Sequence, residues 1–85
     1  MNNFYRLLEY RIRASQLLKQ LRSANPEKYL SAAKRFQRLH SYADHSPEQI
    51  WSGRSGIKLK HAYMLLALEQ GMSSWTEFKR RIISE

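Results

Sequence analysis

The chain has 85 residues, of which 42% are hydrophobic, and it contains no cysteine. This length supports one domain with a small core, and the composition excludes disulfides and thiolate metal sites as sources of stability. Fifteen Lys and Arg against seven Asp and Glu give a formal net charge of +8. That charge favours a polyanionic partner (nucleic acid, an acidic protein surface or an anionic membrane), and a basic domain without such a partner is the alternative.

Membrane insertion and export are not expected from the sequence. The apolar run at residues 64–68 is far shorter than the roughly 20 residues of a membrane-spanning helix. The first residues show no basic segment followed by an apolar one, so we expect no signal peptide and no membrane partner. The lack of cysteine fits a cytoplasmic location.

The first predicted helix covers residues 4–22. Asn2 and Asn3 are its candidate N-caps. At 100° per residue its apolar residues share one broad face: Phe4, Leu7, Leu8, Ala14, Leu18 and Leu21. Arg11 falls inside this apolar arc. We interpret it as an arginine whose charged head reaches the rim, with a contact across an interface to a carboxylate or phosphate as the alternative.

The second predicted helix covers residues 26–42, with Asn25 as N-cap and Pro26 at its first position. One side carries an apolar stripe: Tyr29, Ala32, Ala33, Phe36, Leu39, His40 and Ala43. The other side is basic, without an acidic residue between positions 28 and 39. It predicts phosphate contacts at Lys34, Arg35 and Arg38, and an ordinary solvated face is the alternative.

A short helical turn is predicted at residues 47–51, because Ser46 is a good N-cap and Pro47 suits the first helical position. Ile50 and Trp51 of this turn are expected to fold back onto the core. Residues 52–56 contain two of the three glycines. They predict a flexible loop or an exposed basic hairpin tip around Arg54.

The third main helix is predicted at residues 58–70 and the fourth at residues 75–83. The third is apolar nearly all round, which predicts a central helix with the others packed about it. Gly71 suits the left-handed position after a helix end. Ser74 and Glu77 predict a capping box at the start of the next helix. Trp75, Phe78 and Ile82 are the residues of the fourth helix that we expect to be buried.

This corner can be compared with a DNA-binding helix-turn-helix. Ala67 precedes Gly71 by four residues, as in that motif, but one extra residue follows the glycine and Trp75 stands where a recognition helix offers polar groups. We interpret the corner as an ordinary αα-corner. The basic residues on the exposed side of the fourth helix remain candidate phosphate contacts: Lys79, Arg80 and Arg81.

Few residues suggest catalysis or metal binding. His40 and Asp44 could share a helix face beside His45, but a metal site requires a third ligand and a second shell of partners. A histidine at a helix C-terminus, complementing the helix dipole, is the simpler interpretation. No serine–histidine–aspartate arrangement, glycine-rich phosphate loop or paired carboxylates occur. We therefore predict no catalytic residue, no metal, no cofactor and no enzymatic activity.

Several short segments resemble a family of small bacterial helical domains with the pattern LKHA…AxExG(F/Y)xSWxx(L/F)K. The resemblance runs from about residue 33 to residue 82. Its clearest parts are Leu59-Lys60-His61-Ala62, Ala67-Leu68-Glu69-Gln70-Gly71 and Ser74-Trp75. The chain departs from the pattern at Met72, where the pattern has an aromatic residue. No activity is associated with these domains, so the resemblance implies a helical fold and no function.

Together these patterns predict a single all-α domain, a compact bundle of four main helices and one short helical turn. The predicted function is a small basic non-enzymatic module that contacts nucleic-acid phosphates, DNA or RNA. The alternative is a protein-interaction or homodimerisation module, a regulator or inhibitor of a partner protein. It would use the apolar edge of the first helix: Phe4, Tyr5, Leu8 and Ile12.

Overall fold

The computed structural model describes residues 3–84, and the side chains of residues 5–84. The described chain is all-α, as predicted. Its helices are α1 (Asn3–Leu21), α2 (Pro26–Phe36), α3 (Pro47–Ser52), α4 (Leu59–Glu69) and α5 (Trp75–Ser84), with 3-10 turns η1 (His40–Tyr42) and η2 (Arg54–Gly56). None of the helices within residues 3–84 has the length and hydropathy that a membrane crossing requires.

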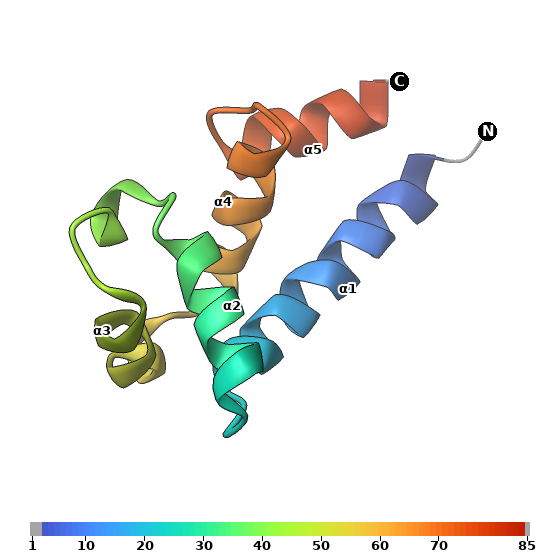
Figure 1. The fold of residues 1–85 in the computed structure, drawn as a ribbon. Helices are drawn as coiled ribbons and strands as arrows, with labels where there is room; N and C mark the ends of the chain where they lie inside the picture. The colour runs from blue at the N-terminus through green and yellow to red at the C-terminus, as the bar shows by residue number, and fades with distance from the viewer. Residues whose placement is uncertain (1–2, 85) are drawn as a thin grey trace.

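Helix α1 forms one long side of the molecule and contacts three other helices (Figure 1). Its first half lies beside α5, its second half beside α2, and α4 packs against it as well. Helix α4 also contacts three helices, α1, α2 and α5. Asn3 lies inside α1 and is therefore not its N-cap; the other candidate cap, Asn2, lies outside the described residues.

The core consists of two clusters of buried side chains. The larger joins α1, α2 and α4 and includes Leu17, which is 2% exposed and which the predicted apolar face of the first helix did not contain. The smaller joins the two ends of the described chain: Leu7, Ala67, Phe78 and Ile82. Leu8 was expected on the buried face but is 42% exposed, because it lies on the edge of α1 away from the helices that cover it.

Helix α2 ends at Phe36, six residues earlier than predicted. Leu39 takes an extended backbone (φ −70°, ψ 136°) and is 5% exposed. A continued helix cannot give Leu39 this backbone, so burial of one leucine outweighs local helix propensity. His40 and Ala43, which were expected on the apolar stripe, are consequently exposed.

Where a flexible loop or an exposed basic hairpin tip was expected, Ser52 ends α3 and residues 54–56 form the 3-10 turn η2. Arg54 is half-buried, donates from Nη1 to the Trp51 carbonyl at 3.0 Å, and places its guanidinium 4.0 Å from the Trp51 ring centroid. The same indole stacks on Tyr29 of α2 at 4.4 Å between ring centroids. The turn therefore attaches α3 to α2 through Trp51.

The corner between α4 and α5 has the predicted glycine geometry. Gly71 has φ +81°, its N–H donates to Leu68 O at 3.0 Å, and the Met72 N–H donates to Ala67 O at 2.9 Å. These are the two hydrogen bonds of a Schellman motif. The Ser74 hydroxyl accepts from the Glu77 N–H at 3.1 Å. The Glu77 carboxylate accepts from the N–H of Ser73 at 3.2 Å and from its hydroxyl, so the reciprocal half of the predicted capping box lies one residue earlier.

Candidate nucleic-acid interface

The basic face predicted on the second helix is partly neutralised within the protein. Lys34 and Arg38 are exposed. Arg35 donates from Nε and Nη2 to the two carboxylate oxygens of Glu69 on α4, at 2.9 and 2.6 Å. This hydrogen bonding to Glu69 raises the pKa of Arg35 above its ordinary value. A phosphate at Arg35 would have to compete with a bidentate carboxylate partner.

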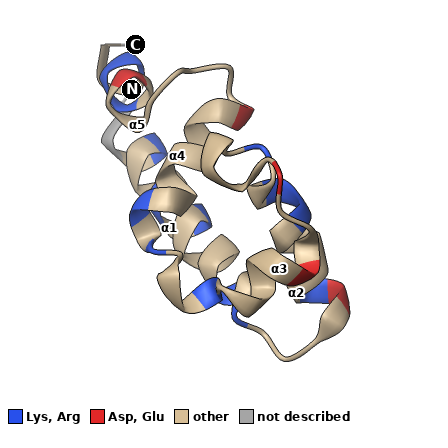
Figure 2. Ribbon diagram, turned by 90° about the vertical axis from the view of Figure 1, so that its left-hand side faces the viewer, with Lys and Arg blue, Asp and Glu red and all other residues tan. Residues whose placement is uncertain are grey.

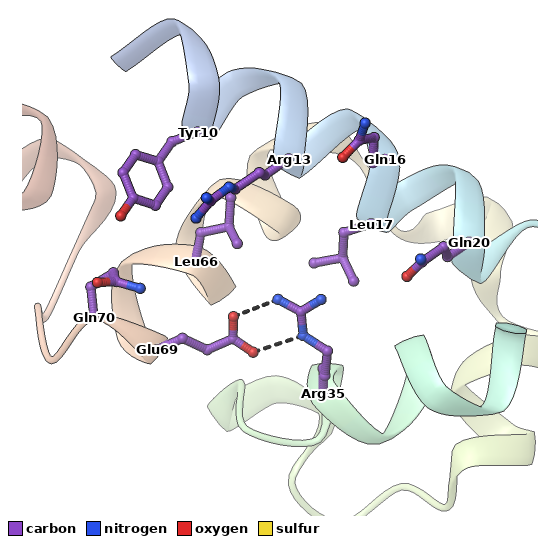
Figure 3. Close-up of a pocket in the computed structure, with 9 residues that line it drawn as sticks. All are labelled: Tyr10, Arg13, Gln16, Leu17, Gln20, Arg35, Leu66, Glu69 and Gln70. Carbon is purple, nitrogen blue, oxygen red and sulfur yellow. Dashed lines mark hydrogen bonds and ion pairs between the residues drawn. The ribbon is translucent and has the colours of Figure 1, made fainter. Parts of the chain in front are cut away.

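The Arg35–Glu69 pair lies in a polar hollow of about 300 Å³ between α1, α2 and α4 (Figure 3). Arg13 of α1 lines the same hollow and bonds Glu9 at 2.8 Å. Three glutamines surround the pair: Gln16, Gln20 and Gln70. Each guanidinium in this hollow thus has a carboxylate partner. The hollow therefore has little spare positive charge for a phosphate.

The exposed face of α2 also carries an acidic residue. Glu27 is exposed and lies seven residues before Lys34, which places both on one side of the helix. Its carboxylate reduces the positive potential that Lys34 would present to a phosphate. The sequence pattern counted charges only from Lys28 onwards and therefore missed this neighbour.

The basic residues of the last helix form a second, separate group. Arg80 and Arg81 are exposed, whereas Lys79 is half-buried. Glu77 is on the same helix, and hydrogen bonds from Ser73, with smaller contributions from Arg81 and Arg80, hold the pKa of its carboxyl below the ordinary value. It is therefore ionised at neutral pH and offsets part of the charge of α5.

The predicted phosphate-contacting residues consequently do not form one surface. Helix α2 packs against α1, α3 and α4, whereas α5 packs against α1 and α4. In Figure 1, α5 lies beside the first half of α1 and α2 beside its second half. Figure 2 shows Lys and Arg on several sides of the molecule, so the positive charge is not confined to these two helices.

A third basic surface lies between α1 and α4 and was not found from sequence patterns. Residues 10–26 and residues 49–68 contain no Asp or Glu. The fold brings these two acid-free stretches side by side: α1 packs on α4, and Arg22 Nη2 donates to Ile57 O at 3.2 Å. The seven basic residues of the two stretches are Arg11, Arg13, Lys19, Arg22, Arg54, Lys58 and Lys60.

The surface is hollowed along α1, and we call it the α1–α4 groove. Two adjoining hollows, of about 370 and 290 Å³, share Ser15 and Lys19. Their other lining residues are Arg11, Ile12, Gln16, Leu18, Arg22, Leu59 and Tyr63. Arg11, Lys19 and Arg22 are all exposed, and at 1.5 Å per residue they extend over about 16 Å of α1. Arg11, which was expected to reach the rim of the apolar face, reaches this groove.

The corner does not present a recognition helix. Trp75 is the first residue of α5 and stacks on Tyr63 of α4, with ring centroids 4.6 Å apart and the ring planes 15° from parallel. Its indole also lies 5.8 Å from the Phe78 ring. A recognition helix exposes its first turn to base edges, whereas here a large aromatic side chain of that turn packs on the preceding helix. The geometry supports an ordinary αα-corner.

The described residues offer no metal centre. No group of three or more His, Asp or Glu within the described chain is placed to hold a metal ion. His40, Asp44 and His45 are exposed, and the His45 ring contacts Tyr42 at 5.8 Å between centroids.

Comparison with protein-family models, with curated proteins and with solved structures gave no match. The resemblance to small bacterial helical domains therefore stays a prediction.

Proposed function

We propose that the protein is a small non-enzymatic module that binds the phosphate backbone of nucleic acid, with the α1–α4 groove as its main contact. The observation that carries the proposal is the packing of two acid-free stretches, residues 10–26 and 49–68, against each other. Because opposite charges are absent from both stretches, the potentials of Arg11, Lys19 and Arg22 add.

The groove suits a phosphate backbone better than base edges. Its cations lie along one side of α1 and at its C-terminal end, and Ser15 and Gln16 between Arg11 and Lys19 supply neutral hydrogen-bond donors. The 16 Å length estimated above equals the axial rise of about five phosphates of one DNA strand. Contacts of this type position a protein on nucleic acid without reading its sequence. The exposed cations of α2 and α5 would add to the attraction.

The salt dependence of binding tests the proposal and measures the size of the interface. Binding to mixed-sequence DNA and RNA is measured at about 50 and 200 mM salt. Three phosphate contacts, in the groove alone, predict a loss of affinity of about 40-fold for duplex DNA. Seven contacts, with Lys34, Arg38, Arg80 and Arg81 added, predict a loss of about 6,000-fold. No binding to either nucleic acid at the lower salt concentration would remove the proposal.

A second candidate, a protein-interaction module, is favoured by exposed apolar side chains on α1. Tyr5, Leu8 and Ile12 are 68%, 42% and 52% exposed, and their spacing of three and four residues places them on one edge of the helix. The side chain of Phe4, predicted to belong to this edge, lies outside the described residues. Farther along the same edge the chain continues with Ser15, Lys19 and Arg22.

The charges at that end restrict any self-association. In a parallel two-fold dimer each residue faces its own copy, so Lys19 would meet Lys19 and Arg22 would meet Arg22. Such a dimer would therefore be confined to the first turns of α1. The dependence of solution mass on protein concentration tests this candidate, and a monomer at every concentration would remove the homodimer.

A further inference from the structure

A separate hollow of about 450 Å³ opens beside α4, on a side of that helix turned away from the α1–α4 groove. Its floor is apolar and consists of Leu39, Met64 and Leu68. On a helical wheel Met64 and Leu68 lie about 100–180° from Leu59 and Tyr63, which line the groove. A ligand in this hollow would therefore not compete with nucleic acid in the groove.

The hollow follows from the early end of α2. Helix α4 is apolar nearly all round, and its other sides are covered by α1, α2 and α5. Beside the remaining side lies the short turn at Leu39, His40 and Ser41. Met64 and Leu68 are therefore half-buried, and they lie in a concave place with the size of a small-molecule pocket, about 300–1,000 Å³.

The rim of the hollow is basic. His40, Lys60 and His61 line it, and the described lining residues include no carboxylate. The His61 Nδ1 accepts a hydrogen bond from the Lys58 N–H at 2.9 Å. Because Nδ1 is the acceptor, the neutral ring carries its proton on Nε2, which is a donor. Ser73 also lines the hollow, but its N–H and hydroxyl both donate to Glu77.

We propose that this hollow binds a small molecule with an apolar body and one carboxylate. The aliphatic or aryl body would lie on Met64 and Leu68, and the carboxylate would accept hydrogen bonds from Lys60 and the two histidines. An apolar floor with a few polar groups at the rim is the usual composition of a ligand pocket. An inorganic phosphate would leave the apolar floor empty, and a neutral hydrocarbon would gain nothing from the charge of Lys60.

The first experiment compares three probes with the same chain length and different head groups: octanoate, octanol and octyltrimethylammonium. The readout is the ¹³C-methyl NMR signal of Met64, with the signal of Met72 as an internal control, because Met72 packs against the other core cluster. We expect octanoate to shift the Met64 signal saturably while leaving Met72 in place, and to bind more tightly than the other two probes. Equal binding of octanol, or no shift of Met64 by octanoate, would overturn the proposal.

A matched pair of variants tests the rim. Lys60→Gln is expected to raise the octanoate dissociation constant about fivefold, because it removes an exposed charge partner of the carboxylate. Lys34→Gln removes the same charge from α2, away from the hollow, and should leave the constant unchanged. Ser41→Trp places a large side chain at the rim and should abolish the Met64 shift at unchanged helicity. An equal effect of the two lysine variants, or full binding by Ser41→Trp, would place the probe elsewhere and overturn the proposal.

Discussion

Arg35 and Glu69 are 34 residues apart in the chain and form a two-pronged ion pair that joins α2 to α4. Glu69 is the more buried partner, with 19% of its side chain exposed against 41% for Arg35. Arg35 was predicted to be a free cation on the basic face of the second helix. It instead forms an ion pair that joins α2 to α4.

Removing one partner of this pair should destabilise the protein. Glu69→Gln leaves the guanidinium without its carboxylate, and we expect a loss of about 1–2 kcal/mol in the free energy of unfolding. Water reaches the partly exposed Arg35, so the loss is smaller than the roughly 3–5 kcal/mol for a fully buried pair. Urea denaturation followed by circular dichroism measures it. Glu27→Gln removes an exposed carboxylate from α2 and is the control. If both variants unfold alike, the pair contributes no more than a surface charge.

The second prediction concerns backbone strain at the corner. Gly71→Ala should cost about 1 kcal/mol, because its φ of +81° disfavours any residue with a Cβ. A Cβ there would meet nothing within 4 Å, and the same is true at Gly56, whose φ is not positive. Gly56→Ala is thus a control with equal space and no such strain, and it should be close to neutral in thermal denaturation. Equal stability of the two variants would contradict the left-handed corner.

The third prediction is a pH dependence due to Glu77. Hydrogen bonds from Ser73 lower the pKa of this carboxyl below its ordinary value of 4.5. A carboxyl with a lowered pKa stabilises the folded state above the unfolded value and loses that effect as the pH falls through the folded value. Thermal melting of the wild type and of Glu77→Gln should therefore differ by a constant amount well above pH 4.5, and the difference should disappear as the pH falls through the lowered pKa of the folded state. A difference that stays constant with pH would show that the Ser73 bonds do not depend on the ionised carboxylate.

The fourth prediction locates the phosphate contacts. Arg11→Gln with Lys19→Gln removes two charges from the α1–α4 groove, and Lys34→Gln with Arg38→Gln removes two from α2. All four residues are exposed, so both double variants should fold. If the groove alone makes the phosphate contacts, the first pair lowers the slope of log affinity against log salt by about 2, whereas the second leaves it nearly unchanged; if α2 adds contacts, both pairs lower it by about 2. The reverse result would place the interface on α2, and equal small effects would indicate diffuse attraction.

The fifth prediction concerns the apolar edge of α1. If Tyr5, Leu8 and Ile12 mediate self-association, Ile12→Asp should give a monomer at concentrations where the wild type is larger by analytical ultracentrifugation. Ile12 is 52% exposed, so the helix content should not change. Ile83→Asp on α5 is the matched control, since Ile83 is 61% exposed and lies on another helix. Loss of association in the control alone would move the interface to α5.

The helix starts and the corner could be predicted because their causes are local. Asn25 and Ser46 accept from backbone N–H groups at the starts of α2 and α3, within three residues of themselves. Gly71 adopts its left-handed conformation beside the hydrogen bonds of its own turn. Such features depend on short-range geometry, which the sequence displays directly.

The end of α2 and the candidate interface could not be predicted for the opposite reason. Helix α2 ends because Leu39 is buried against residues far along the chain, and no Gly or Pro marks that place. The cations of the α1–α4 groove all lie in the first acid-free stretch, but the hollow itself forms only where Leu59 and Tyr63 of α4 pack beside that stretch. Arg35 belonged to a basic run in the sequence, and its partner Glu69 is on another helix.

The smaller core cluster has a consequence for local unfolding. It joins Leu7 of α1 to Phe78 and Ile82 of α5, and Tyr10 meets the Phe78 ring edge-on at 4.8 Å. The cluster is small, so detachment of α5 should require less free energy than global unfolding and should be visible as faster amide hydrogen exchange in residues 75–84. Each such opening would expose Leu7 and Tyr10 beside the apolar edge of α1 formed by Tyr5, Leu8 and Ile12. We expect aggregation on heating to begin at this enlarged apolar surface.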